Sequence, residues 1–418
     1  MSKQRLIALF MRVVGAGGSA LLAFTIAKLT DPSFLGEFQY FLTIALGLAI
    51  LARVGLDRGV VRYIAKSTQA EETQQIMNAS LRVIFKKSLL ILVAMLIILL
   101  ILYFTGKINN TNTFVLFSFP LMSLSVLISG YYKGIFKPNI SFIFDMGFIS
   151  LVSSIVILAI SLFSTRYYVY IPLAFMFSYF LVVALGILVN KNNFFSKTKV
   201  SLSLLKDMRS SSNNFMWMTL SVYMQQLVLV LALTYYLSSY DLGLYKIAEK
   251  LAMLVGFFQA VVTAIYSPYF SKLYHSGKLT ELTQYARKAS NMSLVLSLPS
   301  LMIIAIFSKE LLNLFGQSYT EASTILIILA VAQFVNVILG PAAMILNQTE
   351  YEKISRNIVL LFSMLSLPLI TIACHLYGTI GGASMILIIS LLQNLSFYFY
   401  VYKRMNILVY PSLSLRSK

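Results

Sequence analysis

Apolar stretches of about 20 residues follow one another along almost the whole chain, with only short polar segments between them. A hydrocarbon core about 30 Å thick needs about 20 helical residues for one crossing. The pattern therefore predicts an all-α, multi-pass membrane protein with about twelve transmembrane helices. The predicted spans are residues 6–29, 38–56, 88–105, 114–132, 140–164, 168–189, 215–237, 247–270, 292–307, 322–344, 358–376 and 383–402.

The composition and the distribution of charge support this class. Only 11% of the 418 residues are charged, whereas a soluble domain has about 25%. With the N-terminus in the cytoplasm, all but six of the 33 Lys and Arg residues fall on the cytoplasmic side. This imbalance favours an even number of spans with both termini in the cytoplasm. The six exceptions are Lys28, Lys107, Arg166, Lys246, Lys250 and Lys309.

Several other classes are not supported. The net charge of +19 is spread over short segments without an aromatic platform, which argues against nucleic acid as the partner. The isolated His275 and His375 argue against a metal site, and the absence of a phosphate-binding glycine-lysine loop argues against ATP. We therefore expect no cofactor. The first apolar stretch is too long for a signal-peptide core and is expected to be a retained helix, and the single Cys374 can form no internal disulfide.

An internal repeat divides the chain into two halves. The most polar stretch, residues 190–214, separates an expected N-terminal six-helix bundle (1–195) from a C-terminal one (196–418). Leu35-Gly36-x-Phe38 after the first span matches Leu242-Gly243-x-Tyr245 after the seventh. With six helices each, the halves share one orientation, which is a parallel repeat with binding sites between its copies. Chance similarity of two helix pairs is the alternative.

Longer pieces of the sequence resemble a known family. The run Leu29–Phe38, the span ending at Gly55 and the basic segment Arg58–Lys66 resemble the start of bacterial polysaccharide flippases. These O-antigen and capsule repeat-unit transporters belong to the multidrug/oligosaccharidyl-lipid/polysaccharide (MOP) exporter superfamily. Further similar pieces, in the same order along the chain, begin at Gly243, Tyr266, Phe315 and His375.

The resemblance implies a fold and a function. It implies a V-shaped, MATE-like pair of bundles with the first and seventh helices beside a central cavity. It also implies a polyprenyl-linked oligosaccharide as cargo, usually carried on undecaprenyl diphosphate. Such a flippase moves its cargo from the inner to the outer leaflet of the bacterial cytoplasmic (inner) membrane by alternating access, for assembly of O-antigen, capsule or exopolysaccharide. A polymerase or co-polymerase is a conceivable partner beside the membrane lipids, although the sequence has no docking motif.

Basic residues in the first span are candidates for binding the diphosphate. A charge in a membrane helix costs about 2.5–3.5 kcal/mol on insertion scales, so it is a functional candidate. Arg12, followed by Gly15, Gly17 and Gly18, either binds a phosphate or extends to the headgroups. Lys28 lies about 160° around an ideal helix from Arg12, so it joins the same site only if the helix bends.

Two clusters of charges lie at helix ends. Arg53, Asp57 and Arg58 close the second span, where Arg53 and Asp57 are four residues apart. They form either a cargo contact or a structural ion pair. At the outer end of the eighth span lie the residues Lys246, Glu249 and Lys250. This second cluster is either satisfied by itself or is a phosphate site for release.

The remaining candidates are polar residues inside spans. Asp145 is the one carboxylate expected inside a span away from its ends. It either couples transport to an ion or, as we favour, pairs with Arg12 or Arg53. Gln225 is a candidate for sugar hydroxyls in a polar stripe with Asn214 and Ser221. Further amides more commonly bind one another across helices: Gln259, Gln333, Asn336, Gln393 and Asn394.

The function predicted is therefore transport and not catalysis. A multidrug antiporter of the same superfamily is the nearest alternative, but it exports cations and needs acidic residues in its cavity. A membrane polysaccharide polymerase is less favoured, because no outer loop is large enough to form an active site around a glycan.

Overall fold

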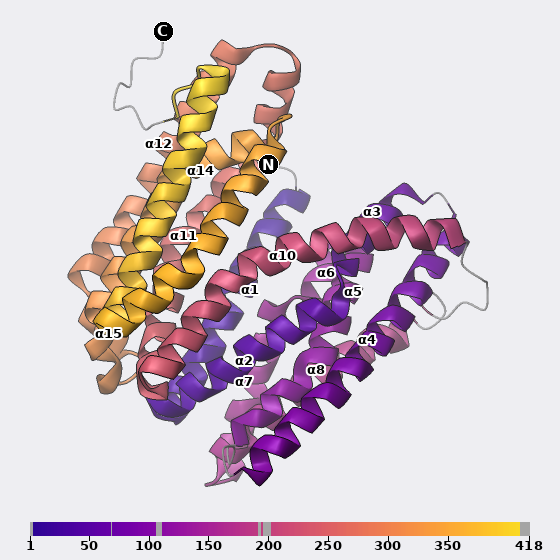
Figure 1. The fold of residues 1–418 in the computed structure, drawn as a ribbon, viewed down its shortest axis with the longest axis vertical. Coiled ribbons are helices and arrows are strands. Elements are labelled where there is room, and N and C mark those ends of the chain that lie inside the picture. Colours follow the sequence, from indigo (N-terminus) through magenta and orange to yellow (C-terminus); the bar gives the residue numbers. More distant parts are fainter. Residues whose placement is uncertain (1–2, 68, 106–110, 191–193, 195–201, 410–418) are drawn as a thin grey trace. The chain divides into compact units, whose positions relative to one another are not determined.

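The computed structural model describes residues 3–67, 69–105, 111–190, 194 and 202–409, and throughout these residues the elements are helices, without a strand (Figure 1). The N-terminal elements are α1 (Lys3–Leu29), α2 (Pro32–Arg53), α3 (Leu56–Lys66), α4 (Ala70–Phe104), η1 (Thr111–Ser118), α5 (Phe119–Gly134), α6 (Pro138–Ser141), η2 (Phe142–Phe144), α7 (Met146–Phe163) and α8 (Tyr167–Val189). The C-terminal elements are α10 (Leu202–Tyr236), α11 (Ser239–His275), α12 (Leu279–Ile306), α13 (Ser308–Asn313), η3 (Gln317–Ala322), α14 (Ser323–Asn347) and α15 (Glu352–Met405).

The helices confirm an all-α, multi-pass membrane protein. By length and composition, 9 helices of the described chain can cross a membrane. One of them, α15, contains the predicted spans 358–376 and 383–402, which are separated where Gly378 leaves the helical conformation with φ 63° and ψ −147°. The predicted spans 6–29 and 247–270 lie on α1 and α11. All of the predicted spans thus fall on helices.

One predicted span, residues 140–164, is interrupted. It consists of α6, η2 and α7, and Asp145 lies between η2 and α7 in an extended conformation with φ −79° and ψ 148°. The Phe144 carbonyl oxygen accepts a hydrogen bond from the Ser125 hydroxyl of α5. Because a neighbouring helix satisfies this carbonyl, the break carries a smaller cost in a membrane.

The chain divides into two compact units. Unit 1 comprises Met1–Asp31 and Glu37–Tyr223, and unit 2 comprises Pro32–Gly36 and Met224–Lys418. The division falls inside α10, which is one helix from Leu202 to Tyr236. The boundary between residues 195 and 196, expected from the polar stretch, stays a prediction.

Small residues let α1 and α7 pack closely in unit 1. A Cβ built on Gly18 would stand 2.1 Å from the Gly147 carbonyl oxygen, and one built on Gly147 would stand 2.2 Å from the Gly15 oxygen. Such contacts are possible only between glycine faces, as is common for membrane helices. Gly15 and Gly18 therefore serve the close approach of the two helices.

The basic segment after the second span forms the short amphipathic helix α3. Its residues Leu56, Val60 and Ile64 are buried, and a Cβ built on Gly134 of α5 would stand 2.9 Å from Ile64. The apolar face of α3 is therefore covered by α5 and does not enter the lipid. Its basic side chains, such as that of Arg62, remain exposed.

Unit 2 is built mainly from α11, α12, α14 and α15, which pack along one another (Figure 1). One hydrophobic cluster of this unit includes Phe270, Leu282, Ile345 and Val401. The first turn of α2 also belongs to unit 2. This turn lies against the start of α11, where a Cβ built on Gly243 would stand 2.0 Å from the Pro32 oxygen.

Candidate functional site

A cluster of charged residues lies on α11 within unit 2. The Lys246 ammonium donates a hydrogen bond to Glu249 Oε2 at 2.9 Å, and the two side chains are only 2% and 17% exposed. Lys250 is half-buried, and both other charges act on it electrostatically. The cluster therefore holds two cations and one carboxylate, which leaves a net positive charge.

The beginning of α11 explains why these side chains meet. The Ser238 hydroxyl accepts a hydrogen bond from the Asp241 N–H at 3.2 Å and donates one to Asp241 Oδ2 at 2.5 Å, which caps the helix. Burial and then a hydrogen bond with Glu321 raise the pKa of the Tyr240 phenol in the first turn, so this group stays neutral at physiological pH. From this fixed start, positions 246, 249 and 250 share one helical face.

A buried tyrosine adds a polar group to the cluster. Tyr245 is fully buried, and its hydroxyl has no hydrogen-bond partner among the residues that the structure describes. Glu249 and the Cys374 thiol are near enough to act on this hydroxyl electrostatically. An unpaired hydroxyl beside an excess of positive charge is suited to an anion with several oxygens, because such an anion accepts hydrogen bonds from both kinds of donor.

A second pair on the next helix shows what is special about Lys246. Lys278 and Glu281 have the same spacing and the same 2.9 Å distance, but their side chains are 58% and 46% exposed. Solvent screens such a pair, and pairs of this kind contribute little. Burial therefore distinguishes the pair on α11 from an ordinary surface ion pair.

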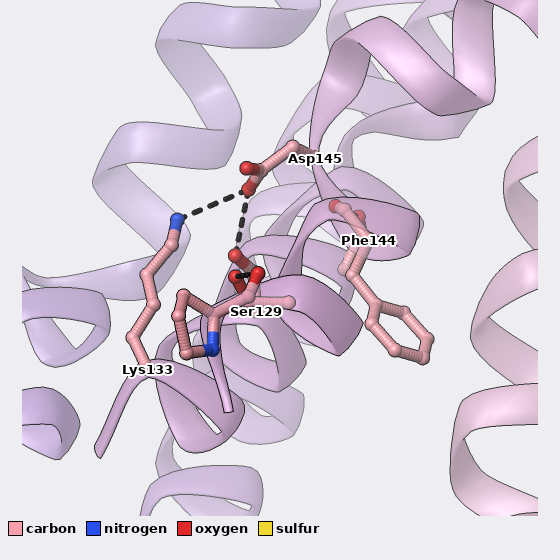
Figure 2. A network of polar contacts seen from close by, with 7 residues as sticks. Ser129, Lys133, Phe144 and Asp145 are labelled. Atoms are coloured by element: carbon pink, nitrogen blue, oxygen red, sulfur yellow. Dashed lines mark hydrogen bonds and ion pairs between the residues drawn. The ribbon is translucent and has the colours of Figure 1, made fainter. Parts of the chain in front are cut away.

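The broken span in unit 1 holds a different polar network (Figure 2). Asp145 Oδ1 accepts hydrogen bonds from the Ser129 hydroxyl at 2.6 Å and from the Lys133 ammonium at 3.2 Å. Figure 2 shows both donors pointing from α5 toward the carboxylate. The Lys133 and Asp145 side chains are 45% and 40% exposed, so the pair is partly solvated.

The structure corrects one expectation about Asp145 and gives it a partner. Asp145 is not inside a continuous helix but occupies the N-cap position of α7. Among the described side chains its cationic partner is Lys133 and not Arg53, whereas pairing with Arg12 stays a prediction. The physical reason is the extended backbone at the break, which directs the carboxylate toward α5. The expected role as a charge partner fits this geometry, with a different partner.

Arg53 is buried at the end of α2 in unit 1. It is 9% exposed, and Asp57 and the Tyr179 hydroxyl act on it electrostatically. Its Nε has no hydrogen-bond partner within the described part of the chain. Arg58 lies on α3 with an exposed side chain. Of the three charges, Arg53 is thus buried beside an acid and Arg58 is exposed.

Of the two candidate residues in the first span, only the Lys28 side chain belongs to the described residues. Lys28 is exposed at the end of α1, and its ammonium lies 5.8 Å from the centre of the Phe24 ring. That distance suits a cation–π contact. The side chains of Arg12 and Asn214 lie outside the described residues. Whether Arg12 binds phosphate stays a prediction.

Three of the candidate amides of unit 2, Gln225, Asn336 and Asn394, bind other helices. Gln225 Nε2 donates to the Ser363 hydroxyl of α15 at 3.1 Å. The Asn336 Oδ1 of α14 accepts hydrogen bonds from Ser390 at 2.6 Å and from Asn394 at 2.7 Å. These contacts are the interhelical role that we expected to be commoner. A sugar-contact role for Gln225 stays a prediction.

Sequence reasoning missed two partners of the candidate residues. Lys133 lies four residues after Ser129 on one helical face, but its distance from Asp145 in the sequence hides the contact. Tyr245 belongs to the internal repeat, and the sequence does not mark it as a polar group beside Glu249. For metals the expectation was none, and no group of three or more His, Cys, Asp or Glu that could hold an ion occurs in the residues searched, which are those described.

Comparison with known families decides the membership. The family described as "Polysaccharide biosynthesis protein" matches residues 6–274, which include the lysine cluster on α11. The chain belongs to the polysaccharide biosynthesis protein family. The family described as "MatE" matches residues 215–372. No curated protein matches the sequence significantly.

Solved structures agree on the fold of this family member. An inward-facing multidrug resistance MATE family transporter of the MOP superfamily is 16% identical, with a TM-score of 0.70 over 96% of this chain and 98% of that one. The lipid II flippase MurJ in an inward closed conformation is 16% identical, with a TM-score of 0.69 over 95% of this chain and 87% of that one. A MATE protein in a bent conformation is 14% identical, with a TM-score of 0.60 over 97% and 94%.

The fold is therefore that of MATE transporters, as predicted. These neighbours are transporters and a flippase, and at this identity they show the fold alone. The protein is a multi-pass membrane protein of the polysaccharide biosynthesis protein family.

Proposed function

We propose that the protein is a flippase for a polyprenyl-diphosphate-linked oligosaccharide in a bacterial cytoplasmic membrane, with both termini in the cytoplasm. The observation that carries this proposal is the net positive, buried cluster of Lys246, Glu249 and Lys250 on α11. Family membership supports it, because assembly of a surface polysaccharide needs a lipid-linked glycan on the outer face of the membrane.

The chemistry of the cargo matches the cluster. A diphosphate carries negative charges that cannot enter hydrocarbon without cations to meet them. Glu249 holds Lys246 in place at 2.9 Å, and Lys250 supplies a second positive charge. The Tyr245 hydroxyl offers one more donor. Each phosphate oxygen can accept such hydrogen bonds, and those from charged donors are the stronger ones.

The other candidate residues take supporting roles in this proposal. Lys28, Arg53 and Arg58 contact the anionic cargo at other stages of its passage, and Arg12 does so in the first span. The carboxylates Asp57, Asp145 and Glu249 act as charge partners, since a cation lies beside each of them. An alternating-access cycle then moves the diphosphate between sites without leaving it unpaired.

A drug exporter is the second candidate function. The match of the MatE family to residues 215–372 favours it, because that segment contains the same cluster. An exporter of organic cations needs a surplus of acid in its site, whereas this cluster has a surplus of base. The two functions therefore predict opposite cargo charge.

Deletion of the gene tests the proposal. We expect loss of surface polysaccharide and accumulation of a complete lipid-linked repeat unit on the cytoplasmic face. Complementation with the natural sequence should reverse both effects, and complementation with Lys250→Gln should not. Lys278→Gln is the matched control, because it removes a lysine from the exposed pair on α12. Unchanged surface polysaccharide together with increased sensitivity to cationic drugs would reject the flippase and support the exporter.

A further inference from the structure

Two glutamines on neighbouring helices of unit 2 have side-chain amides without a partner in the described part of the chain. Gln259 on α11 and Gln333 on α14 are half-buried, and within the described residues their side-chain amides form no hydrogen bond. By contrast, Asn336, one turn beyond Gln333, has hydrogen bonds to two residues of α15. A polar group without a partner in the hydrocarbon region is costly. The two unpaired amides therefore need a physical explanation.

Glycines hold both amides in place. A Cβ built on Gly256 of α11 would stand 2.6 Å from Gln333 Oε1, and one built on Gly340 of α14 would stand 2.6 Å from Gln259 Nε2. The side-chain amide of each glutamine thus contacts a glycine of the facing helix. Because glycine has no side chain, each amide contacts the backbone of the facing helix directly. The donor and acceptor atoms of the two amides form no hydrogen bond there to any described residue.

The two helices that carry the pair have no charged residues around it. Between Lys250 and Lys272, α11 has no Asp, Glu, Lys or Arg, and α14 has none over its whole length. Gln259 lies nine residues after Lys250, which is about half a turn around an ideal helix. The amide pair is therefore a separate site from the lysine cluster, and its chemistry is that of a neutral ligand.

We propose that Gln259 and Gln333 bind hydroxyl groups of the glycan, with Gly256 and Gly340 as the residues that position them. This inference rests on the proposed function, since it assigns the sugar part of the cargo to a site of its own. A primary amide offers two N–H donors and a carbonyl acceptor, and a sugar hydroxyl both donates and accepts. Two amides on facing helices can therefore bind hydroxyls of one glycan.

Binding measurements with purified protein in lipid nanodiscs test this site. The probes are the lipid-linked repeat unit extracted from the deletion strain, and inorganic diphosphate. We expect the double variant Gln259→Leu/Gln333→Leu to bind the lipid-linked unit about tenfold more weakly or worse, which is the loss of about one to two hydrogen bonds. Its binding of inorganic diphosphate should stay unchanged.

Two further variants separate binding from folding. Asn336→Leu removes an amide of the same helix that already has partners, so it should lower thermal stability and leave the affinity of the folded protein unchanged. Gly256→Ala keeps both amides but displaces the Gln333 oxygen, so it should weaken glycan binding in the same direction as the double variant.

The outcomes distinguish the two proposals. If the natural protein binds the lipid-linked unit and the double variant binds it equally well, the amide site is wrong and the flippase assignment stands. If the natural protein does not bind the lipid-linked unit at all, the proposed function is wrong and the glycan site is wrong with it.

Discussion

Gly36 lies against Gly243 in unit 2, so the two glycines that mark the internal repeat touch one another. A Cβ built on Gly36 would stand 2.9 Å from the Gly243 nitrogen and 1.7 Å from the Ser239 oxygen. A Cβ built on Gly243 would stand 2.0 Å from the Pro32 oxygen. The two glycines of the repeated Leu-Gly pattern therefore contact one another. This contact requires that neither position has a side chain.

A side chain at either glycine should destabilise the protein. Gly36→Ala and Gly243→Ala each force backbone atoms apart, and overpacking of this kind costs about 1–3 kcal/mol. Thermal unfolding of purified protein in detergent measures the loss. Gly17→Ala is the control, because a Cβ at Gly17 meets nothing within 4 Å. Equal melting temperatures for Gly243→Ala and Gly17→Ala would contradict the close packing.

Removal of one partner of the buried ion pair on α11 should cost more than removal of both. Lys246→Met leaves Glu249 with reduced solvent and without the cation that it binds at 2.9 Å, and breaking a buried pair costs about 3–5 kcal/mol. The double variant Lys246→Met/Glu249→Met should be close to the natural protein in stability. Denaturation of the three proteins under one set of conditions measures both effects.

Lys278→Met provides the comparison for that series. It breaks a pair of equal length on α12 that is exposed, so its stability should not change measurably. If Lys246→Met were as stable as Lys278→Met, burial would not govern the pair on α11. In the flippase proposal both Lys246 variants lose transport, although only the single one loses stability.

Asp145→Asn should have a small effect on folding. The ion pair with Lys133 is partly solvated, and pairs of this kind contribute at most about 1 kcal/mol. The loss should diminish at high salt, because ions screen the interaction. Thermal unfolding at low and high ionic strength measures it. A stable variant that has lost the ion dependence of transport would instead assign Asp145 to ion coupling, against its role as a charge partner.

Hydrophobic patterning was enough to place the membrane helices, because each crossing needs its own apolar segment. It could not reveal the break before Met146. The extended backbone at Asp145 depends on Ser125 and Lys133, which come from another helix. The apolar pattern of residues 140–164 does not show which residues of another helix they contact. It therefore predicts one continuous span.

The candidate site was predictable to a similar extent. The spacing of Lys246, Glu249 and Lys250 on one helix made their cluster visible in the sequence. The degree of burial was not visible, and the exposed pair Lys278 and Glu281 has the same spacing. Likewise, several amides of unit 2 are visible in the sequence, but only the structure separates paired Asn336 from unpaired Gln333.

The helix α10 belongs to unit 1 up to Tyr223 and to unit 2 from Met224, without a break between them. A continuous helix that belongs to both units transmits strain from one unit to the other, because its hydrogen-bonded backbone resists local stretching. The only tryptophan of the chain, Trp217, lies on this helix with an exposed side chain. Its native fluorescence can therefore report the working motions of the protein in a membrane, without any attached dye.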